Sequence, residues 1–558
     1  MRILRGRGDR TDGGTQLNAA GPDLEEHLDD LRRMKRPVVL IAGPTSKRDL
    51  PRWRAAFEYR LHVLADLRAR PELEESGAVQ AATNDEIAAY LRSIGPVAAV
   101  VDEQATTLVE QLQRWQRSFF HIAAGGSFIS LRTEKRSPWA AALESLGSRR
   151  IGAGEVEELQ DSITRTWDSD GRTISAKQRD HLVKVRHEDA LELLPGRLGA
   201  QNVRVLGSRR AATVKDQPIV RSTGSDVAHK LPAFPMQAPE LSLLEVRGGT
   251  TLGPAMLAVT GSTVLPSSFK HPWRAWNDEL RNVSEQIALP MTKPRPETPR
   301  LDGVFFDLTA PEPGDRAQFL SVSLSKLWGW AEAKRREPAL RALYRTSPED
   351  PEAVFQRDVL HAFGIVPEDV HMVDCDVVVE RLVIASQSWQ DGGHHYAHPV
   401  NAETWAAIRR GLGVDGDGPD RVFLTRHDSN GTPLPRNAAE VMARFGALGF
   451  TIVNLDSATA SEVARTLRGA RTVAGFSGGA LHASLFAADP EHIVVVTHDS
   501  NTSRSEHLFA TLLATEIDYL WSRPDVAQPK DKFSSAAFRS AWDVDLRANA
   551  TALDALRR

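Results

Sequence analysis

The chain has little of several features that point to a compartment or a class of partner. It holds one cysteine, Cys375, among 558 residues, which excludes an internal disulfide framework and fits a reducing compartment. The formal net charge of −4 provides no general attraction to nucleic acid or anionic lipid. The N-terminus lacks an apolar segment of signal-peptide length, and no run reaches the roughly 18 apolar residues of a membrane span. We therefore expect a cytoplasmic protein with no integral membrane segment and no nucleic-acid partner.

The chain is long enough for several domains, and its apolar pattern favours the α/β class. A length of 558 residues exceeds what one core can serve, and a hydrophobic share of 41% can fill more than one core. Short apolar runs alternate with amphipathic stretches, which is typical of mainly parallel sheets covered by helices. We predict a flexible N-terminus (1–30), a Rossmann-like α/β domain (31–145), a connecting region with a linker (146–239) and two further lobes (240–400 and 401–558).

The N-terminal domain shows this alternation clearly. Buried strands are predicted over 37–43 and 96–102, and helices over 52–70, 85–94 and 105–118. The strand that ends at Asp102, the helix after it and the turn at Gly125 and Gly126 resemble the second half of a class I methyltransferase. The cofactor half has no counterpart, because no second glycine follows Gly43 at the spacing that lets a backbone approach S-adenosylmethionine. We interpret this region as a degenerate structural domain, with an active methyltransferase as the alternative.

Residues 420–496 carry the most distinctive pattern of the chain. A short apolar strand ends at Arg426, a loop brings Arg436, and after a helix and another strand a glycine turn (475–479) opens into a helix. Main-chain N–H groups and the positive end of a helix dipole attract anions, and arginines add charge-assisted hydrogen bonds. The pattern therefore predicts a site for the diphosphate of a nucleotide sugar. The donor-binding residues that we expect are Arg426, Arg436, Asn437, Gly475, Ser477, Gly478, Gly479 and His482.

Each of these features also has a simpler structural explanation. A glycine turn is common wherever a strand leads into a helix in an α/β protein. Arg426 could form a surface ion pair with Asp428 or Glu440, and such pairs contribute little. The two arginines together with the glycine turn favour a binding site over these explanations.

The order and spacing of these pieces resemble the family 61 glycosyltransferases. In that family a strand ends in Ser/Thr-Arg, an Arg and an Asn-acid pair follow, Gly-Phe precedes a strand, and a Gly-x-His-Gly-Ala-Gly-Leu type turn opens a helix. This chain departs from the pattern at Ser477, where the family usually has histidine, and at Ala438, where it has an acid; the later Glu440 is kept. The resemblance continues more weakly from about Leu241 to the end of the C-terminal half.

The resemblance implies a fold and an activity. The fold is a GT-B-type pair of facing Rossmann-like lobes, placed after the N-terminal Rossmann-like domain. The activity is an inverting transfer of a sugar from a nucleotide-diphosphate donor, expected to be a UDP-sugar, to a glycan or lipid-linked acceptor in surface polysaccharide biosynthesis. Neither a cofactor nor a metal ion is expected, and a homo-oligomer is compatible with this role.

An acceptor-side segment (315–328) resembles the helix that faces the acceptor in this family, but its polar residues differ. Gln318 stands in place of a histidine, Val322 in place of an acid, and Lys326 in place of an arginine. Since glutamine cannot act as a general base, another residue must accept the proton of the acceptor hydroxyl. The candidates are Asp315, Asp307 and the pair His394 and His395, of which we select Asp315 and His394 as catalytic. The same losses fit a catalytically inactive binding or scaffold protein.

Two further sequence patterns indicate a function less specifically. A histidine loop (392–398) lies at the predicted hinge between the two lobes, where it is either a solvated turn or part of the acceptor cleft. Asp-x-Asp pairs begin at Asp374, Asp415 and Asp543. Such a pair can hold a divalent ion on a diphosphate, but 73 acidic residues make chance matches expected. We predict no metal site.

Overall fold

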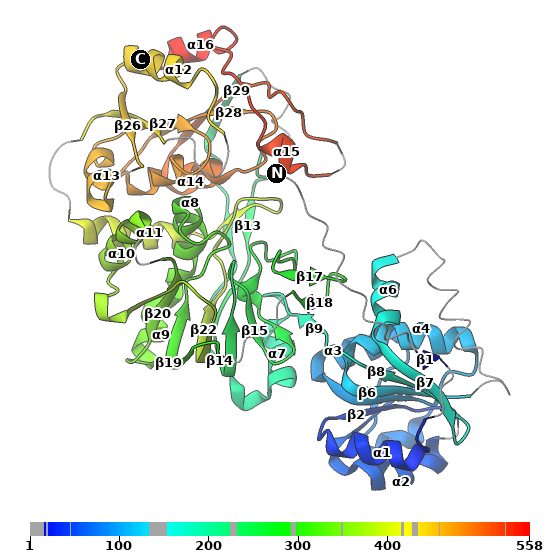
Figure 1. Cartoon of the computed structure of the whole chain (residues 1–558). Coiled ribbons are helices and arrows are strands. Elements are labelled where there is room, and N and C mark those ends of the chain that lie inside the picture. The colour runs from blue at the N-terminus through cyan, green and yellow to red at the C-terminus, as the bar shows by residue number, and fades with distance from the viewer. Residues whose placement is uncertain are drawn as a thin grey trace. The chain divides into compact units, whose positions relative to one another are not determined.

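The computed structural model describes residues 16–17, 21–44, 46–132, 153–223, 231–291, 297–347, 350–413, 418–426, 433–456, 458–530 and 532–557. The chain divides into two compact units (Figure 1). Unit 1 takes 1–201, 260–264 and 278–293, and unit 2 takes 202–259, 265–277 and 294–558. Among the described residues, no helix is both long enough and apolar enough to cross a membrane.

Unit 1 is built on an eight-stranded sheet with the order β1-β7-β8-β6-β5-β2-β3-β4. The strands are β1 (Gln16–Leu17), β2 (Val38–Ile41), β3 (Leu61–Ala65), β4 (Val79–Gln80), β5 (Val97–Asp102), β6 (Ile122–Leu131), β7 (Ile163–Ser169) and β8 (Arg172–Lys177). The strands from β4 to β6 are parallel, and β8 runs antiparallel to both of its neighbours. The helices are α1 (Leu24–Arg33), α2 (Ser46–Phe57), α3 (Asn84–Ile94), α4 (Leu108–Ser118), α6 (Ala153–Asp161) and α7 (Ala190–Leu198).

Helices cover both faces of this sheet because its central strands are apolar on both sides. Successive side chains of a strand point to opposite faces. Val38 and Leu40 accordingly join one core with α1 and α2, whereas Val39 and Ile41 join a second core with α3 and α4. Figure 1 shows α1 and α2 on one side of the sheet and α4 on the other. A smaller group of strands completes the unit, with β9 (Leu182–Lys184) between β16 (Thr263–Val264) and β18 (Ile287–Pro290), and β17 (Leu280–Asn282) beside β18.

Two stretches of unit 1 differ from the sequence prediction. The helix predicted over 52–70 is wrong in its second half: α2 ends at Phe57, and β3 follows because its apolar residues pair with β2 inside the sheet. Residues 153–198, which we predicted as part of a connecting region, form α6, β7, β8, β9 and α7. Asp170 and Gly171 both have positive φ angles at the turn between β7 and β8, as a tight hairpin requires.

The first sheet of unit 2 centres on β14 (Leu241–Leu252). This strand pairs antiparallel with β10 (Val203–Arg209) and β22 (Val377–Ala385). Beyond β22 lie β19 (Arg300–Asp307), β20 (Arg341–Arg345) and β21 (Val370–Val373), each parallel to the strand before it. The remaining short strands of the unit are β11 (Ala212–Val214), β13 (Met236–Ala238), β15 (Ala258–Thr260), β23 (Trp389–Gln390) and β24 (Tyr396–Ala397).

Helices pack on this sheet, and the acceptor-side segment (315–328) is among them. The chain is helical from Arg316 to Arg336, through α8 (Arg316–Gln318), a π-helical turn (Phe319–Ser323), a 3-10 helix (Leu324–Gly329) and α9 (Trp330–Arg336). Every residue from Phe319 to Trp330 is buried, and its polar members, Ser321, Ser323, Ser325 and Lys326, donate hydrogen bonds to main-chain carbonyls. Helices α10 (Pro351–Phe363) and α11 (Val400–Leu412) follow.

The second sheet of unit 2 has six parallel strands in the order β12-β29-β28-β27-β25-β26. They are β12 (Ile219–Thr223), β25 (Arg421–Thr425), β26 (Thr451–Asn454), β27 (Thr472–Phe476), β28 (His492–His498) and β29 (Glu516–Ser522). Their helices are α12 (Ala438–Ala447), α13 (Ala460–Leu467) and α14 (Ser505–Leu513), and the short helices α15 (Ser535–Phe538) and α16 (Ala550–Ala555) follow. One hydrophobic core contains residues of both sheets of the unit.

The strand order of this second sheet reverses once. From β25 the chain passes outward to β26, and it then returns to β27 on the other side of β25 and continues to β28 and β29. Such a reversal opens a crevice at the carboxyl ends of the two strands, where open α/β sheets bind ligands. The predicted α/β class with Rossmann-like parallel sheets is confirmed. A GT-B arrangement of lobes stays a prediction.

Candidate functional site

The structure places Arg426 and the glycine turn at this reversal. β25 ends at Thr425 and β27 ends at Phe476, and the parallel register sets Leu424 opposite Gly475. Arg426, which is half-buried, and the glycine turn therefore leave adjacent strands at the same edge of the sheet. Two of the predicted elements are thus neighbours for a reason that is local in sequence, since each directly follows an apolar strand.

The shape of the glycine turn explains its glycines. A Cβ atom on Gly475 would lie 2.7 Å from the carbonyl oxygen of Leu424 and 3.1 Å from Cγ of Leu481. Gly478 has a φ of 108°, a conformation that favours glycine strongly. The turn opens into a six-residue 3-10 helix, η10 (Leu481–Phe486), which is much shorter than the α-helix that the sequence suggests.

Two main-chain donors of the turn are engaged within the protein. The N–H of Ser477 donates to the carbonyl of Val496 at 2.9 Å, so it extends the β27–β28 pairing. The N–H of Gly478 donates to Oε1 of Glu506 at 2.6 Å. Glu506 is 2% exposed, and burial raises the pKa of its carboxyl, although the charge of His482 and the Gly478 N–H oppose this rise. A buried carboxylate therefore occupies an amide that we expected to face the diphosphate.

The side chain of Ser477 ties the turn to the next strand. Its hydroxyl donates to Oγ1 of Thr497 at 2.9 Å and accepts from Nδ2 of Asn501 at 2.8 Å. All three residues are buried. Ser477 thus belongs to a hydrogen-bonded network that fixes the turn.

The acceptor-side segment contacts the glycine turn directly. A Cβ on Gly479 would lie 3.1 Å from Cβ of Ala317, and Nδ1 of His482 lies 3.2 Å from the carbonyl oxygen of Ala317. Because a carbonyl only accepts, Nδ1 of His482 donates this hydrogen bond, and in the neutral ring the lone pair would then lie on Nε2. Asp315 caps the segment, since its Oδ1 accepts from the N–H of Gln318 at 2.8 Å. Oε1 of Gln318 is buried without a hydrogen-bond partner among the described residues.

Sequence reasoning missed Asp391, which precedes the histidine loop. Its Oδ2 accepts hydrogen bonds from Ser505 at 2.7 Å and from Ser503 at 3.2 Å. Burial acts to raise the pKa of Asp391, but Lys270, the Ser505 hydroxyl, His482 and His271 outweigh burial and lower the pKa to about 2. Asp391 is therefore a permanent carboxylate whose charge His482 experiences.

The histidines after Asp391 have different surroundings. His394 is exposed, and its ring centroid lies 5.1 Å from that of Trp273. His395 is half-buried; burial, together with the charge of Arg504, lowers its pKa to about 4, so it is neutral at pH 7. Asp307 is fully buried, bonded to Thr309 and 3.8 Å from Nζ of Lys326, and so it is enclosed away from any acceptor.

Arg436 and Asn437 form a different kind of contact. The exposed guanidinium of Arg436 forms ion pairs with Asp525 and Asp543, which raise its pKa further. The amide of Asn437 bonds both ways with the main chain of Val544, at 3.0 and 2.9 Å. These residues anchor the segment before α16, and any role of theirs in donor binding stays a prediction. Residues 427–432, including Asp428, lie outside the described residues, as do Asp415 and Asp417.

Unit 1 has a strand reversal of its own, between β2 and β5, but protein atoms fill it. A Cβ on Gly43, just after β2, would overlap the main-chain carbonyl of Glu103, just after β5. The Glu103 carboxylate accepts from Ser46 at 2.7 Å, from Nε1 of Trp53 at 2.9 Å and from Arg172 at 3.1 Å. This packing supports a structural role for the domain.

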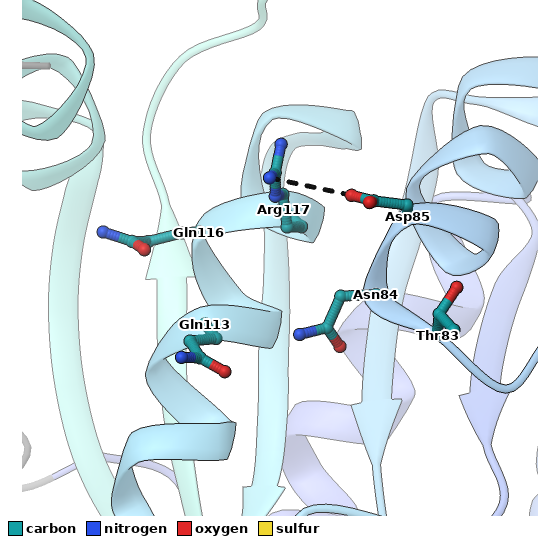
Figure 2. A pocket seen from close by; sticks show the side chains of 6 residues that line it. All are labelled: Thr83, Asn84, Asp85, Gln113, Gln116 and Arg117. Atoms are coloured by element: carbon teal, nitrogen blue, oxygen red, sulfur yellow. Dashed lines mark ion pairs between the residues drawn. The ribbon is translucent and has the colours of Figure 1, made fainter.

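A shallow surface depression of about 340 Å³ lies elsewhere in unit 1 (Figure 2). It is lined by Thr83, Asn84, Asp85, Gln113, Gln116 and Arg117. Arg117 and Asp85 pair across it at 3.6 Å, and both side chains are mostly exposed. It holds polar groups of two surface helices and none of the candidate residues. Among the described residues, no three His, Cys, Asp or Glu side chains gather as metal ligands would.

Comparison with known proteins bears out the resemblance to the family 61 glycosyltransferases over part of the chain. Residues 351–495 match the family model for glycosyltransferase 61; they run from α10 into β28 and include Arg426 and the glycine turn. No curated protein sequence matches the chain.

Similar solved structures include MycE methyltransferase from the mycinamycin biosynthetic pathway. Its complex with Mg and SAH is 15% identical, with a TM-score of 0.23 over 28% of this chain and 48% of that chain. Its complex with Mg, SAH and mycinamycin VI is 14% identical, with a TM-score of 0.23 and the same coverage. The likeness lies in the N-terminal part and spans about half of the methyltransferase chain.

Proposed function

We propose that unit 2 is a glycosyltransferase of the family 61 type. It takes a sugar from a nucleotide-diphosphate donor, a UDP-sugar in the first instance, and transfers it with inversion and without a metal ion to a glycan or lipid-linked acceptor. Surface polysaccharide assembly is the natural role for this reaction. The observation that carries the proposal is the meeting of Arg426 and the glycine turn at the strand reversal, inside the segment that matches the family model.

The surroundings of His482 support it as the general base, in preference to the residues selected from sequence. Asp315 uses one carboxylate oxygen as a helix cap, and His394 is exposed beside Trp273. His482 instead has its Nδ1 held by the Ala317 carbonyl, which leaves Nε2 able to accept a proton. Asp391 and Glu506 both experience the charge of His482, and their negative charge would stabilise the imidazolium that forms.

The transfer then requires a proton transfer from the acceptor and the departure of the diphosphate. The acceptor hydroxyl oxygen attacks the anomeric carbon of the donor sugar, and its proton passes to Nε2 of His482. The bond between that carbon and the diphosphate oxygen breaks, and the diphosphate leaves with the electron pair. Arg426 would stabilise the negative charge that develops on the leaving diphosphate.

A non-catalytic binding protein is the second candidate. It is favoured by the engagement of the Ser477 and Gly478 N–H groups within the protein and by the buried Oε1 of Gln318 where the family has a histidine. In this case the nucleotide or glycan would bind without turnover.

Calorimetric titration with UDP and UDP-sugars, in the absence of metal, tests the donor site. We expect micromolar binding that weakens roughly 10- to 100-fold in Arg426→Ala, as for the loss of a hydrogen bond to a charged group. Arg471→Ala is the matched control, because Arg471 is exposed and precedes β27 at the opposite end of the strand. Equal binding by wild type and Arg426→Ala, or no binding to any nucleotide, would contradict the proposal.

Release of UDP from a bound UDP-sugar separates the two candidates. A transferase releases UDP by slow hydrolysis even without its acceptor, because water can replace the acceptor hydroxyl. His482→Gln should still bind the donor and release no UDP. Binding without any release by the wild type would favour the non-catalytic candidate.

A further inference from the structure

Two tryptophans of unit 2 are exposed beside the histidine loop. Trp273 is 38% exposed and Trp276 is 47% exposed, and both lie in the irregular segment after Phe269. Single exposed apolar residues are ordinary on protein surfaces. Two indoles within four residues, close to a candidate active-site loop, call for a ligand that uses aromatic surface.

The segment that carries these tryptophans is fixed by side-chain hydrogen bonds. Gln387 donates to the carbonyl of Phe269 at 2.9 Å, and Asn277 donates to the carbonyl of Ser268 at 2.8 Å. Gln390 bonds to the ring of His271 within the same segment. A ligand that binds there meets an ordered surface, so little conformational entropy is lost on binding.

The histidine loop packs against Trp273. The ring of His394 lies 5.1 Å from that of Trp273, and a Cβ on Gly393 would lie 3.4 Å from Cζ2 of Trp273. The ring of His271 lies 5.7 Å from that of Trp273 and bonds to Gln390, the residue before Asp391. The aromatic surface therefore lies beside the loop that carries Asp391.

We propose that Trp273 and His394 form a subsite that binds the glycan acceptor by stacking on one of its pyranose rings, a role that rests on the proposed function. A pyranose has a face of C–H groups that packs on an indole and a rim of hydroxyls that needs hydrogen-bond partners. The indole of Trp273 offers the apolar face, and the exposed imidazole of His394 beside it offers a hydrogen-bonding group to the rim, whereas Arg274 lies over the ring of Trp276. A lipid or protein partner would instead need a broader apolar patch without charges at its centre.

Saturation-transfer NMR on the full-length protein tests this subsite with linear tetrasaccharides of glucose, mannose, xylose and N-acetylglucosamine as probes. We expect at least one probe to bind, and its Kd to rise at least tenfold in Trp273→Ala, which is about 1.4 kcal/mol. Trp273→Phe should restore part of the affinity. Tyr59→Ala is the control, because Tyr59 is an exposed aromatic residue of unit 1.

Three results would overturn the subsite. They are the absence of binding by every probe, full binding in Trp273→Ala, and Trp273-dependent binding of phosphatidylglycerol vesicles without oligosaccharide binding. Titration of the same variants with UDP keeps this test apart from the test of the donor site. Donor binding without oligosaccharide binding removes the subsite and leaves the proposed function, whereas oligosaccharide binding through Trp273 without nucleotide binding removes the transferase.

Discussion

Glu506→Gln is the substitution that tests how the glycine turn holds a diphosphate. In the structure the carboxylate of Glu506 accepts from the N–H of Gly478 at 2.6 Å and is almost completely buried. A diphosphate at this turn would lie close to that carboxylate, and like charges would repel each other. The amide oxygen of glutamine can accept the same hydrogen bond, so the variant keeps the turn and removes the charge.

The expected gain in donor affinity of Glu506→Gln follows from the distance between the Glu506 carboxylate and a bound phosphate. A phosphate oxygen that accepts from the N–H of Gly479, one residue on, would lie about 5 Å from the Glu506 carboxylate. Two unit charges at about 5 Å with an effective dielectric constant of about 20 repel by roughly 3 kcal/mol. This corresponds to a gain of about two orders of magnitude in the affinity of Glu506→Gln for a UDP-sugar when Glu506 is ionised in the wild type.

The pH dependence of donor affinity shows whether the charge of Glu506 weakens or strengthens donor binding. Burial raises the pKa of Glu506, so the carboxyl becomes neutral as the pH falls through that raised pKa. The wild type should therefore bind a UDP-sugar more tightly at pH 5.5 than at pH 8.5, and the affinity gap to Glu506→Gln should close at the lower pH. Calorimetry at both values measures this, with Glu440→Gln, an exposed acid of α12, as the control. Weaker donor binding by Glu506→Gln, or a gap that does not depend on pH, would refute the reasoning.

Two further predictions concern stability. Asp307→Asn leaves the fully buried Lys326 without the carboxylate that lies 3.8 Å away, and it should lower the free energy of unfolding, measured in urea, by about 3–5 kcal/mol. The double variant Asp307→Asn/Lys326→Met should recover much of this loss. Equal stability of the wild type and Asp307→Asn would exclude the pairing. Burial lowers the pKa of His498 from 6.5 to about 4. Between pH 6.5 and 4 the unfolded chain therefore binds a proton that the folded chain does not, and the free energy of unfolding decreases as the pH is lowered, by up to about 3 kcal/mol. His498→Phe should lose less stability than the wild type between pH 7 and 4 in urea titrations, and identical pH curves would contradict the assignment.

The parts of the fold that the sequence predicts well are those with local signals. β2 is apolar at every position and β5 at every position before Asp102, and α3 and α4 begin with capping boxes at Thr83 and Thr107. β3 was missed because its few apolar residues directly follow a helix with the same composition, and only pairing with β2 makes them a strand. β12 was missed for a similar reason, since its partner β29 lies about 300 residues later in the chain.

The residues of the candidate site likewise fall into those that local sequence predicts and those that it does not. Arg426 and the glycine turn follow their strands directly, so their position at the sheet edge can be read from the chain. Glu506 bonds to Gly478 across 28 residues, and Asp391 bonds to Ser505 across 114. No local pattern marks either acid as part of the site. The pairing of Arg436 with Asp525, 89 residues away, escaped prediction in the same manner.

Donor binding and catalysis have opposite protonation requirements, the first through Glu506 and the second through His482. Donor binding improves when Glu506 is protonated, because the repulsion of the diphosphate is then removed. Proton transfer from the acceptor requires an unprotonated Nε2 on His482. A working transferase with this geometry should therefore show a bell-shaped dependence of kcat/KM on pH, and Glu506→Gln should remove the alkaline limb. A non-catalytic binding protein has no use for an unprotonated His482, so its ligand affinity should follow Glu506 alone. The shape of the pH profile thus distinguishes the two candidate functions through residues that the structure already places.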